Sequence, residues 1–191
     1  MNPLRICVFV CILMFIAIAA FAQPIIDQEQ ALMGTTSVLA VGGSSKQKLA
    51  QVFTAGRTGY LTRVTVAIGC TSGAIFNAAI EEAGGGAPSG FVLASETIPG
   101  GVFPPPVGSF RIIEFCKPAL VVRGKQYALT LEVLNPPAES CGVVPGPAGD
   151  SYTGGLGYFD ALPNPPGWIA NIPEVDLAFQ TYVDRAPCCR R

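Results

Sequence analysis

Apolar and polar residues alternate along several stretches of the chain, which is the pattern of strands with one buried face. The clearest stretch is 60–68, and the same period of two returns over 74–81, 126–133 and 175–184. After the N-terminal segment no stretch carries the long apolar stripe of a helix, and only 28–33 would form a short helical turn. Shorter or less regular apolar runs predict further strands at 49–54, 91–98, 109–115, 119–123 and 152–159.

Glycine and proline separate these runs. A glycine-rich segment at 84–90 and a tight reversal at 123–125 are turn signals, because glycine adopts positive φ without strain and proline presets φ. Proline runs at 104–106 and 135–137 cannot lie in a central strand, since proline has no N–H to donate. Short strands between such turns predict an all-β fold, an antiparallel jelly-roll-like β-sandwich of eight or nine strands. A different Greek-key sandwich is the alternative.

The first 22 residues have the three parts of a secretory signal peptide. Arg5 supplies a positive charge, 6–20 is an unbroken apolar run, and Ala20-Phe21-Ala22 matches the small-residue cleavage pattern. We therefore expect a secreted or periplasmic protein without membrane association after cleavage, with a retained anchor as the alternative. The expected organisation is a signal peptide at 1–22, an N-terminal extension at 23–48, a β-sandwich domain at 49–184 and a basic, cysteine-containing tail at 185–191.

The composition excludes several classes of function. The 191 residues include 12 basic and 13 acidic side chains, so the net charge of −1 offers no electrostatic footprint for nucleic acid. Histidine is absent, which removes every mechanism that needs an imidazole base or ligand. With 50% hydrophobic and only 13% charged residues, the chain is expected to fold rather than remain disordered.

Of the seven cysteines, five follow the predicted signal peptide, and export favours disulfides between them. If the strands of a jelly roll are numbered in chain order from 60–69, connections alternate between its two ends. Cys70 then lies at one end, and Cys116 and Cys141 lie at the other. The prediction is a Cys116–Cys141 disulfide, or a bond from one of these to Cys188 or Cys189, with Cys70 unpaired.

Several segments, taken in order, resemble a known family. They are QVFTAG at 51–56, TGYLTRV at 58–64, APSGFVLAS at 87–95, LVVRGKQYAL at 120–129, Gly167-Trp168, and DLAFQTYV at 176–183. Together they resemble the exported bacterial β-sandwich modules of the "choice-of-anchor" surface-protein type, which are loosely similar to carbohydrate-binding modules. The resemblance covers about 49–183. It implies a jelly-roll-like module without established catalysis, and it offers no catalytic residues. The cysteines and the lack of a C-terminal anchor segment depart from the pattern and favour free secretion or a periplasmic location.

The segment 150–171 has the residue types of a sugar-binding site. It contains the single tryptophan and two of the five tyrosines, interleaved with Asp and Asn. Apolar faces of sugars stack on aromatic rings, while sugar hydroxyls need carboxylate, amide or backbone partners. The alternative is that the aromatic residues close one end of the sandwich. The predicted ligand-binding residues are Tyr152, Tyr158, Asp160, Asn164, Trp168 and Asn171.

Two further chemistries are weaker alternatives. A structural Ca²⁺ needs several oxygen ligands, and these could come from Asp150, Asp160, Glu174 and Asp176, although no Asp-rich calcium loop is present. Otherwise we expect no cofactor and no metal. A glycoside hydrolase needs two carboxylates facing each other across a cleft, for which Glu81, Glu82 and Glu96 are candidates.

The function that these patterns favour is a secreted, non-catalytic β-sandwich with a binding or cell-surface structural role. Its partner would be carbohydrate or another cell-surface component. A purely structural or self-associating module is the first alternative, and a carboxylate-dependent hydrolase is the second. The oligomeric state is left open by the sequence.

Overall fold

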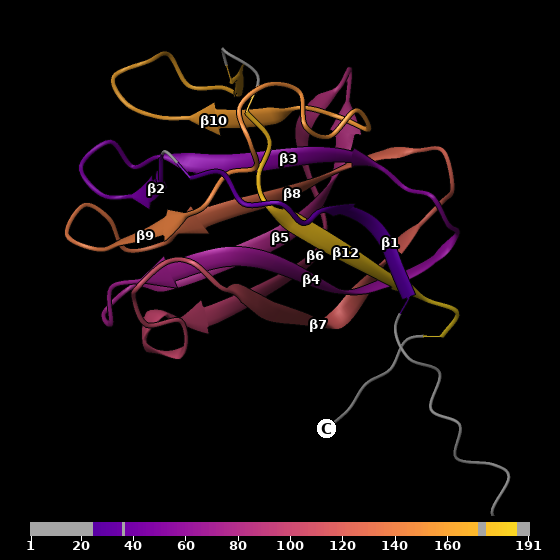
Figure 1. The fold of residues 1–191 in the computed structure, drawn as a ribbon, viewed down its shortest axis with the longest axis horizontal. Helices are drawn as coiled ribbons and strands as arrows, with labels where there is room; N and C mark the ends of the chain where they lie inside the picture. Colours follow the sequence, from indigo (N-terminus) through magenta and orange to yellow (C-terminus); the bar gives the residue numbers. More distant parts are fainter. Residues whose placement is uncertain (1–24, 36, 172–174, 187–191) are drawn as a thin grey trace, which may run out of the picture.

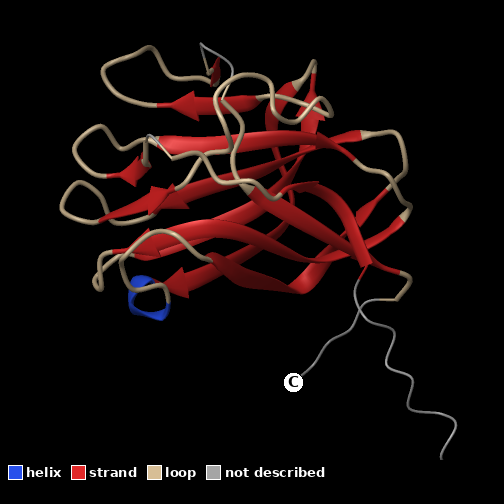
Figure 2. Cartoon of the chain, viewed as in Figure 1, coloured by secondary structure: helices blue, strands red, loops and turns tan. Residues whose placement is uncertain are grey.

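The computed structural model describes residues 25–35, 37–171 and 175–186, which form two antiparallel sheets packed face to face (Figures 1 and 2). The first sheet holds β1 (Ile25–Gln30), β12 (Phe179–Asp184), β4 (Gly59–Cys70), β9 (Ser140–Val143) and β2 (Leu39–Gly42) in that order, with β7 (Phe110–Val121) paired to β4. The second holds β11 (Ile169–Ala170), β10 (Gly157–Asp160), β3 (Lys48–Thr54), β8 (Gln126–Val133), β5 (Ile75–Gly84) and β6 (Ala87–Pro99). The predicted all-β sandwich is confirmed.

The main strands are wound as nested pairs, which is the jelly-roll arrangement. The hairpin β5–β6 lies in the second sheet, β4 pairs with β7 in the first, β3 with β8 in the second, and β1 with β12 in the first. Each pair therefore encloses the previous one and lies in the opposite sheet. Within the described ranges, the only helix is the short 3-10 turn η1 (Gly100–Val102), and none has the length and apolarity of a bilayer span.

The core lies between the sheets and is built by the alternation seen in the sequence. On β8, Tyr127, Leu129 and Leu131 point inward and are buried, as are the facing residues of β4. Phe53 and Phe179 are fully buried, and their ring centroids are 6.4 Å apart across the two sheets. Burying a side chain of this size stabilises the fold by about 2–3 kcal/mol.

The N-terminal part of the sandwich differs from the prediction. The helical turn expected at 28–33 is wrong, because Ile25–Gln30 is an edge strand that pairs with β12 from Ile25↔Val183 to Gln30↔Phe179. Pairing with a neighbouring strand overrides a weak local preference for helix. The segment 23–48, expected to be an extension, supplies β1 and β2, so the sandwich begins well before residue 49. The predicted signal peptide lies outside the described residues.

The strands predicted at 109–115 and 119–123 form one continuous strand, β7. It pairs with β4 along its length, but the register shifts between Leu61↔Ala119 and Arg63↔Glu114. Pro118 lies in this irregularity, where a residue without an N–H is tolerated. A proline at a bulge therefore reads in the sequence as a break between two strands.

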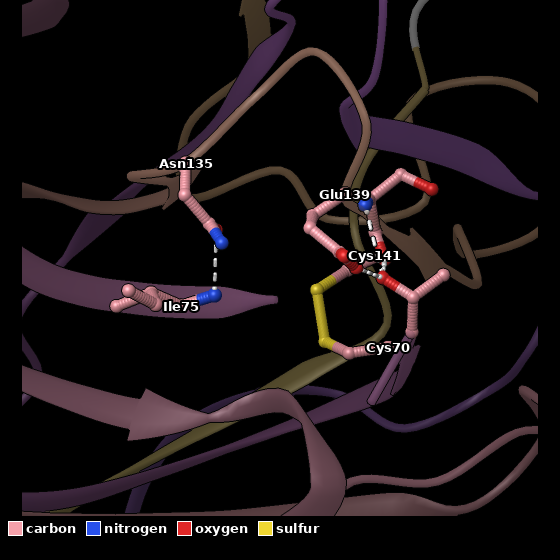
Figure 3. The surroundings of a disulfide bond; sticks show 7 residues. Cys70, Ile75, Asn135, Glu139 and Cys141 are labelled. Carbon is pink, nitrogen blue, oxygen red and sulfur yellow. Dashed lines mark hydrogen bonds between the residues drawn. A yellow bond between two sulfur atoms is a disulfide. The ribbon is translucent and has the colours of Figure 1, made fainter. Parts of the chain in front are cut away.

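A disulfide joins Cys70, the last residue of β4, to Cys141 in β9, with an S–S distance of 2.02 Å (Figure 3). The two residues are register partners in neighbouring strands. The prediction of a Cys116–Cys141 bond with Cys70 unpaired is wrong. Cys188 and Cys189, the other predicted partners, lie outside the described residues. The disulfide is typical of proteins that fold in an oxidising compartment.

The continuous β7 explains this error. Dividing β7 into two strands adds one reversal of chain direction between Cys70 and Cys141, which places the two cysteines at opposite ends of the sandwich. With a single β7, the chain returns along β8 to the end where β4 finishes, and β9 then pairs with the last residues of β4. Cys70 and Cys141 are therefore brought together.

Side chains beside the disulfide join the two connections that cross between the sheets at this end. The Asn135 side chain accepts the N–H of Ile75 at 2.8 Å (Figure 3). It also donates to the carbonyl of Gly73 at 2.9 Å. The hydroxyl of Thr71 donates to the carboxylate of Glu139. These bonds tie the connection after β8 to the turn between β4 and β5, so this end has a structural role.

Candidate functional site

The β10–β11 hairpin forms one edge of the second sheet (Figure 1) and contains most of the predicted ligand-binding residues. Gly157–Asp160 pairs on one side with β3 and on the other with Ile169–Ala170. The loop between the two strands is rich in proline and is held at its base, where the N–H of Leu162 donates to the carbonyl of Ser45 at 2.8 Å. A short strand and a proline-rich loop thus present this segment at the sheet edge.

Strand alternation places Tyr158 and its neighbour Phe159 on opposite faces of the second sheet. Phe159 packs against the core between the sheets, so Tyr158 points to the outer face of the second sheet. Tyr158 pairs with Ala170 and Phe159 pairs with Ile169, so continuing the register by one residue sets Asp160 opposite Trp168. We therefore place Asp160 and Trp168 on the same outer face as Tyr158. The N–H of Gly167 points to Asp160 Oδ1 at 3.5 Å, which agrees with this placement.

The rings of Tyr158 and Trp168 are half-buried. In the described part of the chain, neither ring stacks on another ring or on a cation. The Tyr158 hydroxyl points toward Gly86 at the tip of the β5–β6 hairpin, since a Cβ on Gly86 would lie 3.9 Å from it. Asn164 lies exposed in the loop, where its N–H donates to the carbonyl of Ala161 at 3.1 Å. The outer face of the hairpin thus carries two aromatic rings and a carboxylate, and the loop that joins its strands carries an exposed amide.

Tyr152 is not part of this surface. Its side chain is only 8% exposed, and its ring packs edge-on against Phe179 with 5.1 Å between the centroids. Its hydroxyl donates to Gln28 Oε1 at 2.7 Å, and burial raises its pKa above the ordinary value. For this residue the alternative, an aromatic side chain that fills the sandwich, is the one observed.

Asn171 has its backbone and side chain engaged within the protein. Its N–H donates to the carbonyl of Gly157 at 3.0 Å, and Nδ2 donates to the carbonyl of Val175 at 3.0 Å. Both partners are backbone carbonyls, so the residue positions the end of β11 against the chain that leads to β12. The predicted set of six therefore divides into four residues at the surface and two with structural contacts.

A buried carboxylate fixes the chain on which this site rests. Asp176 is 1% exposed and accepts hydrogen bonds from Gln51 Nε2 at 3.0 Å and from the N–H of Tyr152 at 2.9 Å. The other end of the Gln51 amide accepts the N–H of Leu177 at 2.7 Å. Burial raises the pKa of Asp176, while the Gln51 and Tyr152 hydrogen bonds act against that rise. The Gln51–Asp176 pair therefore joins β3, which lies beside β10, to the segment before β12.

The sequence gives only a faint sign of this anchor. Gln51 interrupts the inward-facing positions Leu49 and Phe53 of one strand, and a polar residue at a core position needs a buried partner. Asp176 is 125 positions away, and no spacing rule connects the two residues.

The acids proposed for Ca²⁺ do not form one cluster, although Asp150 lies close enough to Asp176 to contribute to the rise in its pKa. Asp176 is buried and bound by protein donors, whereas Asp160 belongs to the outer face of the second sheet. Glu174 lies outside the described residues. Among the residues that the structure describes, no three His, Cys, Asp or Glu side chains are grouped closely enough to hold a metal ion.

The carboxylates considered for hydrolysis also point apart. Glu81 is 8% exposed and accepts from the Thr130 hydroxyl at 3.1 Å and from the N–H of Gly90 at 2.8 Å, on the outer face of the second sheet. Glu96 pairs in register with the core residue Ala78 and therefore points to the other face. Glu82, the remaining candidate, is exposed. Glu81 and Glu96 do not form the facing pair that glycoside hydrolysis requires.

Comparisons with known proteins identify no family for this chain. A scan against protein-family models finds no match, and a search of curated protein sequences finds no relative. The fold, the disulfide and the exposed hairpin are therefore the observations on which a function is argued.

Proposed function

We propose that this protein is a secreted, non-catalytic module that binds carbohydrate at the outer face of the β10–β11 hairpin. The observation that carries the proposal is the placement of Tyr158 and Trp168 on one face, with Asp160 between them in the register. Within residues 25–35, 37–171 and 175–186, neither ring is engaged by another ring or a cation. Aromatic faces beside a carboxylate and an amide suit a ligand that has both apolar C–H faces and hydroxyls.

Other features support export and a role outside the cell. The N-terminal segment has the charged, apolar and small-residue parts of a signal peptide, and disulfides persist in oxidising compartments. The resemblance to exported surface modules of the choice-of-anchor type points in the same direction.

The experiment is a glycan array probed with the mature protein and with two variants. Trp168→Ala removes one ring of the proposed site, and Tyr60→Ala removes a half-buried ring from the outer face of the other sheet. We expect binding to one class of glycan, weakened about tenfold or more by Trp168→Ala because a stacked ring contributes about 1 kcal/mol beyond the area it buries. Tyr60→Ala should bind like the parent.

Two results would overturn the proposal. One is the absence of binding to any glycan by a folded protein. The other is a bound glycan whose affinity is the same in the parent and in Trp168→Ala, since the site would then lie elsewhere. Circular dichroism of each variant establishes that it is folded.

A further inference from the structure

A row of polar side chains crosses the outer face of the second sheet from the same hairpin. The register pairs Asp160 with Lys48, and it places Asn77 opposite both Glu132 and Thr97. Lys48 Nζ lies 2.9 Å from Glu132, which completes the row across β10, β3, β8, β5 and β6. The residues are far apart in sequence, and the sheet alone brings them into line.

Hydrogen bonds hold much of this polar row in fixed orientations. Asn77 Nδ2 donates to Glu132 Oε1 at 3.4 Å, and the hydroxyl of Thr97 donates to Asn77 Oδ1 at 3.1 Å. The Lys48 side chain is still 46% exposed and that of Glu132 30% exposed, and Thr97 is exposed as well. The row therefore presents ordered donors and acceptors that water or a ligand can reach.

Less polar positions flank the row on both sides. On one side, the next outward positions of β3, β8 and β5 are Ala50, Thr130 and Ala79, which are all buried. On the other side, Leu134 and Ile75 are 51% and 43% exposed. A chain laid along the polar row would meet hydrogen-bonding groups beneath it and exposed apolar surface on the side of Leu134 and Ile75.

From this arrangement we propose that the outer face of the second sheet binds an extended, uncharged polysaccharide chain that crosses the strands. Trp168 and Tyr158 stack on sugar rings at one end, and Asp160, Lys48, Glu132, Asn77 and Thr97 hydrogen-bond to hydroxyls along its length. The inference rests on the proposed function and extends it from a single contact point to a continuous site.

The chemistry of the polar row selects this occupant. Hydroxyls both donate and accept, which matches a row that mixes carboxylate, ammonium, amide and hydroxyl groups. A polyanionic glycan would meet two carboxylates and a single ammonium that is already paired with Glu132. Neighbouring strands lie about 4.8 Å apart, so five strands span about 19 Å, which accommodates about four sugar units.

The test measures affinity by calorimetry for β-1,4-linked gluco-, xylo- and chito-oligosaccharides of two to six units. For the series that binds, we expect affinity to rise with length and to level off at about four units. Asn77→Ala should weaken the tetramer about threefold to tenfold and leave the dimer unchanged, because it removes one hydrogen-bonding position in the middle of the row. Gln180→Ala, which removes an amide from the outer face of the first sheet, is the matched control and should have no effect.

The outcomes separate this inference from the proposed function. If the dimer binds, Trp168→Ala abolishes its binding, and length and Asn77→Ala have no effect, the extended site is overturned and the hairpin site survives. Tighter binding of an acidic oligosaccharide or of an unstructured peptide would also overturn the extended site. If no saccharide binds the folded protein, both are overturned.

Discussion

On the outer face of the first sheet, the Arg63 guanidinium lies 5.3 Å from the ring centre of Tyr182 and forms an ion pair with Glu114 at 3.4 Å. On the outer face of the second sheet, Tyr158 and Trp168 present rings that no cation or neighbouring ring covers within the described residues. Both faces combine aromatic and charged side chains. They differ in whether those side chains are already engaged with each other.

The difference shows why residue type alone does not locate a site. On the first face, Gln180 accepts from the hydroxyls of Thr65 and Tyr182 and donates to Glu29, so both the oxygen and the nitrogen of its amide are engaged. A ligand would have to displace these contacts before it gained its own. On the second face, the row through Asn77 is ordered but retains exposed groups. The two half-buried rings beside it make no contact with another ring or a cation in the described part of the chain.

The largest expected effect is on stability and comes from removing the disulfide, which joins β4 to β9 in the first sheet. Replacing both cysteines, as Cys70→Ala with Cys141→Ala, should lower the free energy of unfolding by about 4 kcal/mol, because the bond closes a loop of 71 residues. Urea denaturation of the parent and the double variant measures this loss.

Oligosaccharide affinity of the folded double variant sharpens the comparison between the two faces. We expect it to equal that of the parent, since the disulfide lies in the first sheet and the proposed site lies on the second. A loss of affinity without unfolding would show that the two regions are coupled.

The fold was largely predictable, and its main error has a physical cause. Alternation located the principal strands because each has one buried face, and the turns between them are marked by glycine and proline. The error arose at Pro118, where a bulge within β7 has the same sequence appearance as a turn. That one misjudged reversal changed which cysteines were expected to meet.

The candidate site was less predictable, because it depends on register. Tyr152 and Tyr158 both lie in a glycine-rich segment with similar neighbours, yet one is in the core and the other is on the surface. Lys48 and Asp160 become neighbours only through the pairing of β3 with β10. Sequence periodicity predicts the face of a strand, whereas its partner and alignment depend on the whole fold.

A smaller effect on the free energy of unfolding distinguishes the charged residues of the two outer faces. Arg63→Ala should lower the free energy of unfolding by about 1–2 kcal/mol, since the Arg63 side chain is 26% exposed and loses both the Tyr182 ring and Glu114. Lys48→Ala should change stability by less than about 0.5 kcal/mol, because its ion pair is more exposed. Its effect should instead be on oligosaccharide affinity. Equal stability losses in urea denaturation would contradict the distinction between an engaged and an open face.

The smallest expected effect is on the pH dependence of stability, through a partly buried carboxylate in the first sheet and a fully buried one beside the second. Burial raises the pKa of Asp27 in β1 and of Asp176 beside β3, both above the ordinary value of 3.8. The folded state therefore holds these protons more tightly than the unfolded state. Their stabilising contribution is complete below pH 3.8 and is lost as the pH rises through the folded pKa values.

Asp27→Asn tests this sign at the first sheet, because an amide oxygen can still accept the N–H of Gly56, which Asp27 Oδ2 accepts at 3.0 Å. In urea denaturation between about pH 4 and pH 7, the stability of the variant relative to the parent should increase as the pH rises. The folded parent loses the favourable proton over that range, and the neutral amide does not. Asp176→Asn is the informative contrast, since an amide nitrogen there would face the donors of Gln51 or Tyr152 and would lower stability at every pH. A relative stability of Asp27→Asn that falls with rising pH would mean that the hydrogen bond and nearby Arg57 outweigh burial at this edge of the first sheet.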